Sequence, residues 1–408
     1  MKLNKKITSL LIAGALSACL VMGAAGCSNS DSAEIDELKS QLAQYEQTLD
    51  EIKNSLKTEE SGYAAECYAK LQYIDAMVKD RDCYAGANFK FAQKWISWNL
   101  IQAGYAEEDI VYHPVTQPKY YKTSVDLAEK LSATSYETLG NYNYDKANKQ
   151  YVEAEDGEYV KVNVTTPNIS LTKKGKSDKQ IIVGAHYDGD GTGDNGSGIS
   201  LALTTAEKIV NLDLEYTITF VFFTAEEYGK IGSTAYANAM TDEEVANTLY
   251  MINLDSLVCG DYAYLYGGVQ DNANKTVTKT EAYDNAMAVA KDLGLSFKSN
   301  PWTWDNLSPA DKENCKEVPS YASPCTGNWS DHYGFKLRGI PYVYFEATNW
   351  EIPDYTGYGE TYLVGMLMNT KNDYLEYINK YFPGRIMKHF ETFSTLLYAL
   401  VTQDNVNF

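Results

Sequence analysis

Short apolar runs alternate with amphipathic segments along most of the chain, and this alternation predicts the fold. Five runs have the composition of strands: residues 159–164, 180–185, 216–224, 249–254 and 339–345. Helical periodicity marks residues 61–80, 87–104, 199–212, 241–246, 282–293 and a last stretch from 371 into the 390s. Apolar strands separated by helices predict an α/β fold with a mostly parallel, mixed central sheet covered by helices on both faces.

The first residues have the pattern of a targeting signal. Three lysines at the extreme N-terminus precede residues 7–25, which carry no charge. An uncleaved membrane-spanning helix is the alternative, because about 20 apolar residues can cross a bilayer. Small residues directly before Cys27 favour cleavage, so we expect residues 1–26 to be a signal peptide.

The residues around Cys27 resemble the lipobox of bacterial lipoproteins, because small residues lead into the cysteine and a polar stretch follows it. The resemblance implies a lipid on Cys27 that anchors the protein to the bacterial cell membrane, outside the cytoplasm. Ordinary secretion is the alternative. Cys19 lies in a second match, but cleavage there would leave an apolar stub on the mature chain.

Residues 27–60 are predicted to form a polar linker and a short coiled-coil stalk. Apolar side chains from Ile35 to Leu56 recur in alternating steps of three and four, which is the seam of a coiled coil. Such a seam would allow self-association through residues 35–56. A single amphipathic helix lying on the body is the alternative. We expect residues 61–408 to form the folded domain.

The charge of the chain limits its partners. Lys and Arg number 35 against 55 Asp and Glu, which gives a formal net charge of −20. Binding to a phosphate backbone needs clustered cations, so no nucleic-acid partner is expected. Hydrophobic residues make up 44% of the 408 residues and charged residues 22%, which excludes a wholly disordered or collagen-like chain.

Side chains of the types that bind metals lie near the ends of the predicted strands. They are His186, Asp188, Asp194, Glu226, Glu227, Asp255 and His332. In an open α/β sheet, loops at the carboxyl ends of the strands meet at one edge and form the site. Imidazole nitrogen together with carboxylate oxygen suits zinc or a similar divalent ion, and one shared carboxylate would allow two ions.

Glu226 and Glu227 are adjacent and directly follow an apolar run. Neighbours in an extended strand point in opposite directions. We therefore expect one glutamate to bind metal while the other faces the substrate.

These motifs, in this order, resemble the zinc aminopeptidase family numbered twenty-eight among the metallopeptidases. Its members include secreted bacterial aminopeptidases, glutamate carboxypeptidase and glutaminyl cyclase. The resemblance covers the chain from about residue 87 to the C-terminus, and residues 226–233 and 331–341 strengthen it. It implies a fold of the zinc-exopeptidase type and makes residues 61–408 a metallopeptidase domain.

The resemblance also implies a role for each ligand-type residue. His186 and Asp255 would bind one zinc, Glu227 and His332 would bind a second zinc, and Asp194 would bridge the two.

Two further residues would act around the metals. Glu226 would be the general base for a hydroxide that bridges the zincs, and Asp188 would orient the His186 ring through its second nitrogen. In the family the peptide bond after the bridging aspartate is often cis, so we expect a cis bond between Asp194 and Asn195.

The expected activity is that of a di-zinc exopeptidase, an aminopeptidase acting on the N-termini of peptides or proteins. A glutaminyl-peptide cyclase, which uses one zinc, is the alternative within this fold. A carboxypeptidase-like member would need a basic group such as Lys336 or Arg338 for the substrate carboxylate. A tethered binding protein that has lost its chemistry would be marked by a missing ligand, and none is missing.

The remaining histidines and a nearby acid are expected to be structural. His113 precedes a proline and is predicted to lie in a surface turn, whereas His389 is predicted to lie in the last helix, near a helix end. Asp190 is expected to be a solvated loop residue.

Cysteine pairing is left open by the sequence. An environment outside the cytoplasm permits disulfides, and two bridges are compatible with the spacing. Cys315 with Cys325 would stiffen a wall near His332, and Cys67 with Cys83 is the other pair.

Overall fold

The computed structural model describes residues 62–84, 87–122, 136–138, 142–145, 150–153, 159–271, 274, 276–303, 322–352 and 359–406. The predicted signal peptide, the lipid attachment at Cys27 and the predicted stalk lie outside these residues. Within the described part, none of the helices combines the length and the apolar character needed to cross a membrane.

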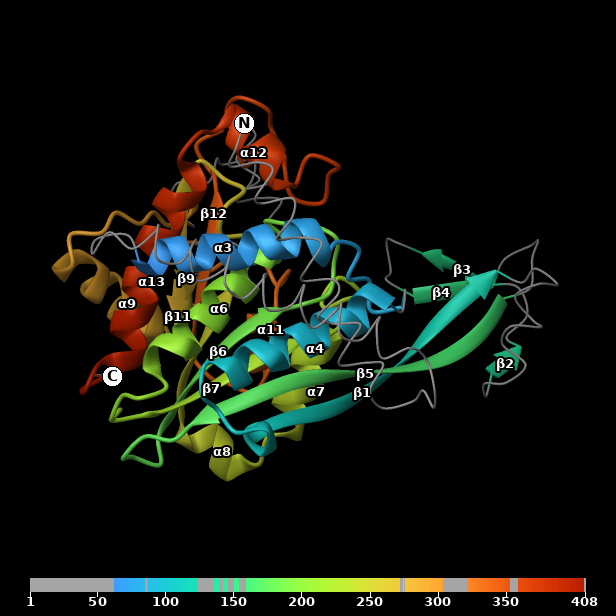
Figure 1. Cartoon of the computed structure of the whole chain (residues 1–408), viewed down its shortest axis with the longest axis horizontal. Helices are drawn as coiled ribbons and strands as arrows, with labels where there is room; N and C mark the ends of the chain where they lie inside the picture. Colours follow the sequence, from blue (N-terminus) through green and yellow to red (C-terminus); the bar gives the residue numbers. More distant parts are fainter. Residues whose placement is uncertain are drawn as a thin grey trace, which may run out of the picture.

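A mixed sheet of eight strands forms the centre of the fold (Figure 1). Its middle is parallel, in the order β7 (Thr217–Phe223), β6 (Gln180–His186), β8 (Thr248–Leu254) and β12 (Tyr342–Thr348). All but two residues of these strands are buried. Burial on both faces explains why they read as continuous apolar runs rather than as alternating ones.

Antiparallel strands complete the sheet at both edges. On one side β5 (Tyr159–Lys173) pairs with β7, and β1 (Ile110–Lys122) pairs with β5. On the other side β9 (Tyr262–Gly267) pairs with β12. Strands β1 and β5 continue beyond the body as a long two-stranded arm, which β2 (Tyr136–Thr138) joins (Figure 1). Two small ribbons lie outside the sheet: β3 (Tyr142–Asp145) with β4 (Gln150–Glu153), and β10 (Val269–Asp271) with β11 (Thr276–Thr278).

Helices cover both faces of the sheet, as predicted. The larger apolar core joins one face to α3 (Gly62–Met77), α4 (Ala87–Gln102), α6 (Gly196–Ile209), α9 (Glu281–Asp292) and α13 (Arg385–Thr402). A smaller core on the opposite face joins the sheet to α7 (Ile231–Ala239) and α11 (His332–Leu337). The short helices are η1 (Glu107–Asp109), α8 (Asp242–Asn247) and α12 (Leu375–Tyr381). The predicted fold class is confirmed.

The last predicted helix is two helices. α12 ends at Tyr381, and α13 begins at Arg385 after Gly384, which has a φ of 81°. Pro383 lacks the backbone N–H that a continuous helix needs, and glycine adopts the left-handed conformation at low cost.

The two histidines outside the candidate site have structural contacts. His113 lies in strand β1 rather than in a turn, and its Nε2 is 2.7 Å from the Ser170 hydroxyl. His389 lies in α13, as predicted, and its Nε2 is 3.0 Å from the Gly260 carbonyl oxygen. Burial lowers the pKa of His389 to about 4, so the ring is a neutral donor and not a cation near a helix end.

No disulfide joins Cys67 to Cys83, although both side chains are buried. Burial raises the pKa of the Cys67 thiol to about 12, so this thiol is unreactive. The predicted bridge between Cys315 and Cys325 is wrong as well. Cys315 lies outside the described residues, but Cys325 is a free, buried thiol whose pKa burial raises to about 12.

The side chain of Phe393 packs α13 against the sheet. Its ring is fully buried, with centroids 5.6 Å from Phe297 and 5.8 Å from Phe345 of β12. We predict that Phe393→Ala lowers the free energy of unfolding by about 3–5 kcal/mol, because it removes this contact and leaves a cavity. Denaturant unfolding measures the change. Glu391→Ala, on the exposed side of the same helix, should cost less than about 0.5 kcal/mol; equal losses in the two variants would contradict the packing.

Candidate metal centre

Three of the predicted ligands come together where the parallel strands end. His186 is the last residue of β6, Asp255 follows β8, and Asp194 lies in the loop that leads into α6. The Nε2 atom of His186 is 3.1 Å from Asp194 Oδ1 and 3.2 Å from Asp255 Oδ1. The three ligand atoms lie within 4.8 Å of one another. One imidazole nitrogen and two carboxylate oxygens at this spacing fit a zinc ion.

The backbone around Asp194 is held by another buried acid. The bond between Asp194 and Asn195 is cis, as expected. The carboxylate of Asp373 accepts hydrogen bonds from the backbone N–H groups of Gly193 (2.6 Å) and Asp194 (2.9 Å). Asn195 caps α6 by accepting from the N–H of Gly198 (3.0 Å). The position of the Asp194 carboxylate therefore depends on Asp373. No motif in the sequence predicted this role for Asp373.

A buried arginine lies behind these carboxylates. Arg81 is fully buried and donates to the carbonyl oxygens of Tyr187 (3.2 Å) and Gly191 (2.8 Å). Burial lowers the pKa of Arg81, while Asp188 and Asp194 act to raise it. The guanidinium therefore both fixes the loop after β6 and places positive charge next to the acids.

Asp188 contacts both the histidine and the glutamate pair. Its Oδ1 is 3.7 Å from Nδ1 of His186, so it lies next to the second ring nitrogen. Its two carboxylate oxygens also accept the backbone N–H groups of Glu226 (3.0 Å) and Glu227 (3.3 Å). Asp188 thus ties the turn after β7 to the metal ligand on β6.

Glu226 and Glu227 both border the cleft, and the division of roles between them stays a prediction. They lie in a turn after β7, where Ala225 has a φ of 55°, and the alternation of an extended strand does not apply. Burial, with added repulsion from Asp331, raises the pKa of Glu226 well above its ordinary value. Loss of hydration and the Asp194 charge raise the pKa of Glu227 to about 8. A bound cation would relieve this repulsion.

His332 lies apart from the three converging ligands. It is fully buried at the start of α11, and its Nε2 is 3.1 Å from the Gly327 carbonyl oxygen. Its ring packs against Tyr342 (centroids 4.6 Å apart) and Tyr344 (5.2 Å). Its Nδ1 makes no hydrogen bond with the described residues. Its role as a ligand of a second zinc stays a prediction.

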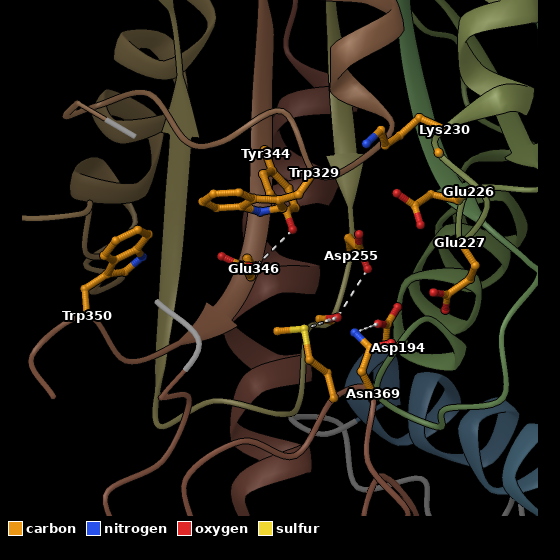
Figure 2. Close-up of a pocket in the computed structure, with 13 residues that line it drawn as sticks. Asp194, Glu226, Glu227, Lys230, Asp255, Trp329, Tyr344, Glu346, Trp350 and Asn369 are labelled. Carbon is orange, nitrogen blue, oxygen red and sulfur yellow. Dashed lines mark hydrogen bonds between the residues drawn. The ribbon is translucent and has the colours of Figure 1, made fainter. Parts of the chain in front are cut away.

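A cleft of about 270 Å³ opens over the site (Figure 2). The sequence singled out Asp194, Glu226, Glu227 and Asp255 from its lining. It gave no role to the other lining residues with reactive or large side chains: Lys230, Ser256, Trp329, Glu346, Trp350, Met368 and Asn369. A carboxylate inside the apolar strand β12 could have pointed to Glu346, whereas Met368 and Asn369 come from a loop without a recognisable motif.

Asp190 is exposed, as expected for a solvated loop residue.

The two basic residues considered for a carboxypeptidase make hydrogen bonds outside the cleft. Arg338 donates to the carbonyl oxygen of Ala237 (2.7 Å), and Lys336 donates to the side chain of Gln270 (2.8 Å). Neither lines the cleft.

Comparison with solved structures shows the fold. The aminopeptidase from Aneurinibacillus sp. strain AM-1 superposes with a TM-score of 0.57 at 16% identity, over 86% of this chain and 96% of that chain. The zinc aminopeptidase BSAP from Bacillus subtilis gives a TM-score of 0.54 at 17% identity, over 84% and 96%.

Sequence comparison shows the family. The alkaline phosphatase isozyme conversion protein of Escherichia coli is 29% identical over 282 residues, which are 63% of this chain and 76% of that protein. Leucine aminopeptidase 2 of Trichophyton rubrum is 37% identical over 120 residues, 28% of this chain and 24% of that protein. The family described as peptidase family M28 matches residues 168–390, more than half of the chain. The chain therefore belongs to peptidase family M28 and is a hydrolase of the metallopeptidase class.

Proposed function

We propose that this protein is a zinc-dependent aminopeptidase that hydrolyses the N-terminal peptide bond of peptides or proteins. The observation that carries the proposal is the convergence of His186, Asp194 and Asp255 in a cleft that Glu226 also lines. Proteins named as aminopeptidases are similar to this chain, in sequence over part of its length or in fold.

His186, Asp194 and Asp255 would hold one zinc. We propose that Glu227 and His332 complete a second zinc site, with Asp194 shared between the two. When bound, zinc lowers the pKa of water and polarises the scissile carbonyl.

Glu226 is the proposed general base. It would accept a proton from the attacking water and return it to the leaving amine, a cycle that suits an acid whose pKa is raised. Asp188 would keep this carboxylate in place through the backbone of the turn.

The charge of the cleft favours a substrate with a free α-ammonium group. Four carboxylates of the lining face the cleft, from Asp194, Glu226, Asp255 and Glu346, together with the more exposed Glu227. They would attract an ammonium group and repel a substrate carboxylate. Lys336 and Arg338, the two basic residues considered for a carboxypeptidase, do not line the cleft, whereas Lys230 lines it close in sequence to the glutamate pair. The five carboxylates outnumber this one lysine, so the lining favours the ammonium group.

Glutaminyl-peptide cyclisation is the second candidate. Only three of the five expected ligands converge in the described residues, and three protein ligands are enough for a single catalytic zinc. The zinc content of the active protein separates the two candidates, since two ions per chain favour hydrolysis and one favours cyclisation.

We also propose that residues 35–56 allow self-association. We further propose that Cys27 carries a lipid that holds the enzyme on the outer side of the bacterial membrane. Membrane fractionation of wild type and Cys27→Ser tests the anchor. Unchanged retention of the variant on membranes would overturn it.

Amino-acid anilides with a free amine should be hydrolysed and their N-acetylated counterparts should not, because the acids of the cleft bind the ammonium group. Chelator should abolish the activity, and added zinc should restore it. Hydrolysis of blocked substrates at a comparable rate would overturn the specificity for free amines.

Glu226→Gln should lower kcat by about 10²–10⁴-fold, because the proton has no acceptor, while the zinc content of the protein stays unchanged. Metal analysis and anilide kinetics on the same preparation measure both. Asp190→Asn, which changes an exposed acid in the neighbouring loop, should keep wild-type turnover. Wild-type turnover in Glu226→Gln would remove Glu226 from this role.

The pKa of Glu227 is about 8 in the folded chain against 4.5 for an ordinary glutamate, so the metal-free folded state holds the extra proton between these values. The stability of the metal-free protein should therefore fall as pH rises from about 4.5 to 8. Zinc neutralises the carboxylates, so the gain in Tm on adding zinc should be larger at pH 8 than at pH 5.

Thermal melts with chelator and with zinc measure this gain. Asp255→Asn should lose most of it, whereas Asp190→Asn should keep it. A gain that is independent of pH, or that survives in Asp255→Asn, would contradict the assignment of the metal site.

A further inference from the structure

We propose that Glu346 is a specificity-determining residue that selects substrates whose first residue has a basic side chain, lysine or arginine. The inference rests on the proposed aminopeptidase function and deepens it by naming the substrate class. It is carried by a buried carboxylate in the cleft that has no cationic partner and stands beside aromatic walls.

Glu346 lies on β12 and is only 5% exposed, yet it lines the cleft. Its Oε1 accepts a hydrogen bond from the Tyr344 hydroxyl at 3.0 Å, and Tyr266 is a second hydrogen-bond partner. Burial nevertheless raises the pKa of Glu346 to about 7, so a nearby cation would favour its charged form. Within the described part of the chain, no lysine or arginine lies within ion-pair distance of it. A buried carboxylate is costly unless a cation compensates it. A substrate that enters the cleft can supply that cation.

The walls of the same cleft are aromatic. The rings of Trp329 and Trp350 are stacked with centroids 6.4 Å apart, and both line the cleft. Trp350 is held in place because its Nε1 donates to the Tyr266 hydroxyl at 2.8 Å. Aromatic faces accept the methylene stem of lysine or arginine and also attract its charge.

The position of Glu346 suits a side chain rather than the α-amine. In the view of Figure 2 it lies between Asp255 and Trp350, on the side of the cleft away from Glu226 and Glu227. Asp255 and Asp194 are nevertheless close enough for their charges to act on it. A first residue whose amine lies at the metal ligands can therefore direct its side chain toward Glu346. An apolar side chain there would cover the carboxylate without pairing it.

The test compares arginine, lysine and leucine anilides on the zinc-loaded full chain, with Glu346→Gln as the variant. The matched control is Glu351→Gln, which removes an exposed carboxylate close in sequence to Trp350 that does not line the cleft. Wild type and control should prefer the basic substrates by about 10-fold or more in kcat/KM. Glu346→Gln should lose about 10- to 100-fold on the basic substrates and change little on leucine, since one charge-assisted contact disappears.

Three results of these kinetic measurements would overturn the inference. An equal loss on all three substrates in Glu346→Gln would assign the carboxylate to the α-amine. A wild-type preference for leucine would refute the basic specificity while leaving the aminopeptidase function intact. Failure to cleave any free-amine anilide would refute the proposed function itself and this inference with it.

Competitive inhibition of the wild type by free arginine and by leucine is a second test, which does not depend on folding of the variant. Tighter inhibition by arginine is expected. Tighter inhibition by leucine would overturn the inference.

Discussion

The gathering of negative charge at the carboxyl ends of four parallel strands is the constraint on which the rest of the structure depends. Loss of hydration, and after it repulsion between the carboxylates, raises the pKa values of Asp194, Glu226 and Glu227, whereas His186 and hydrogen bonds lower that of Asp255. The fold offsets part of this repulsion with the buried guanidinium of Arg81 and with backbone N–H groups that point at Asp188 and Asp373. A divalent cation between His186, Asp194 and Asp255 would offset much of the remainder. Metal binding and the stability of this edge of the sheet therefore depend on the same repulsion between carboxylates.

The same charge explains which chemistry the cleft suits. An acid whose pKa is raised by burial can accept a proton and give it back, as Glu226 is proposed to do. Surplus carboxylates attract cationic groups of a substrate, and the aromatic walls around Glu346 accept apolar ones. These features together favour a peptide N-terminus over a C-terminus as the ligand.

Much of the fold was predictable from the sequence, because the central strands are buried on both faces and read as apolar runs. The cis bond after Asp194 was anticipated as well, and three of the five expected ligands converge. The parts that failed depend on local backbone or on distant contacts. Ala225 has a left-handed backbone conformation, so the two glutamates that follow it lie in a turn and not in an extended strand. His113 lies in the edge strand β1, whose polar residues resembled a turn in the sequence. Arg81 and Asp373 support the site from segments far away in sequence, so no local pattern could reveal them.

The most direct test of this account is anomalous diffraction at the zinc edge from crystals of the zinc-loaded protein. The account predicts a peak about 2.0–2.2 Å from the Nε2 atom of His186 and from carboxylate oxygens of Asp194 and Asp255. A zinc bound elsewhere, with these three side chains left without metal, would contradict it.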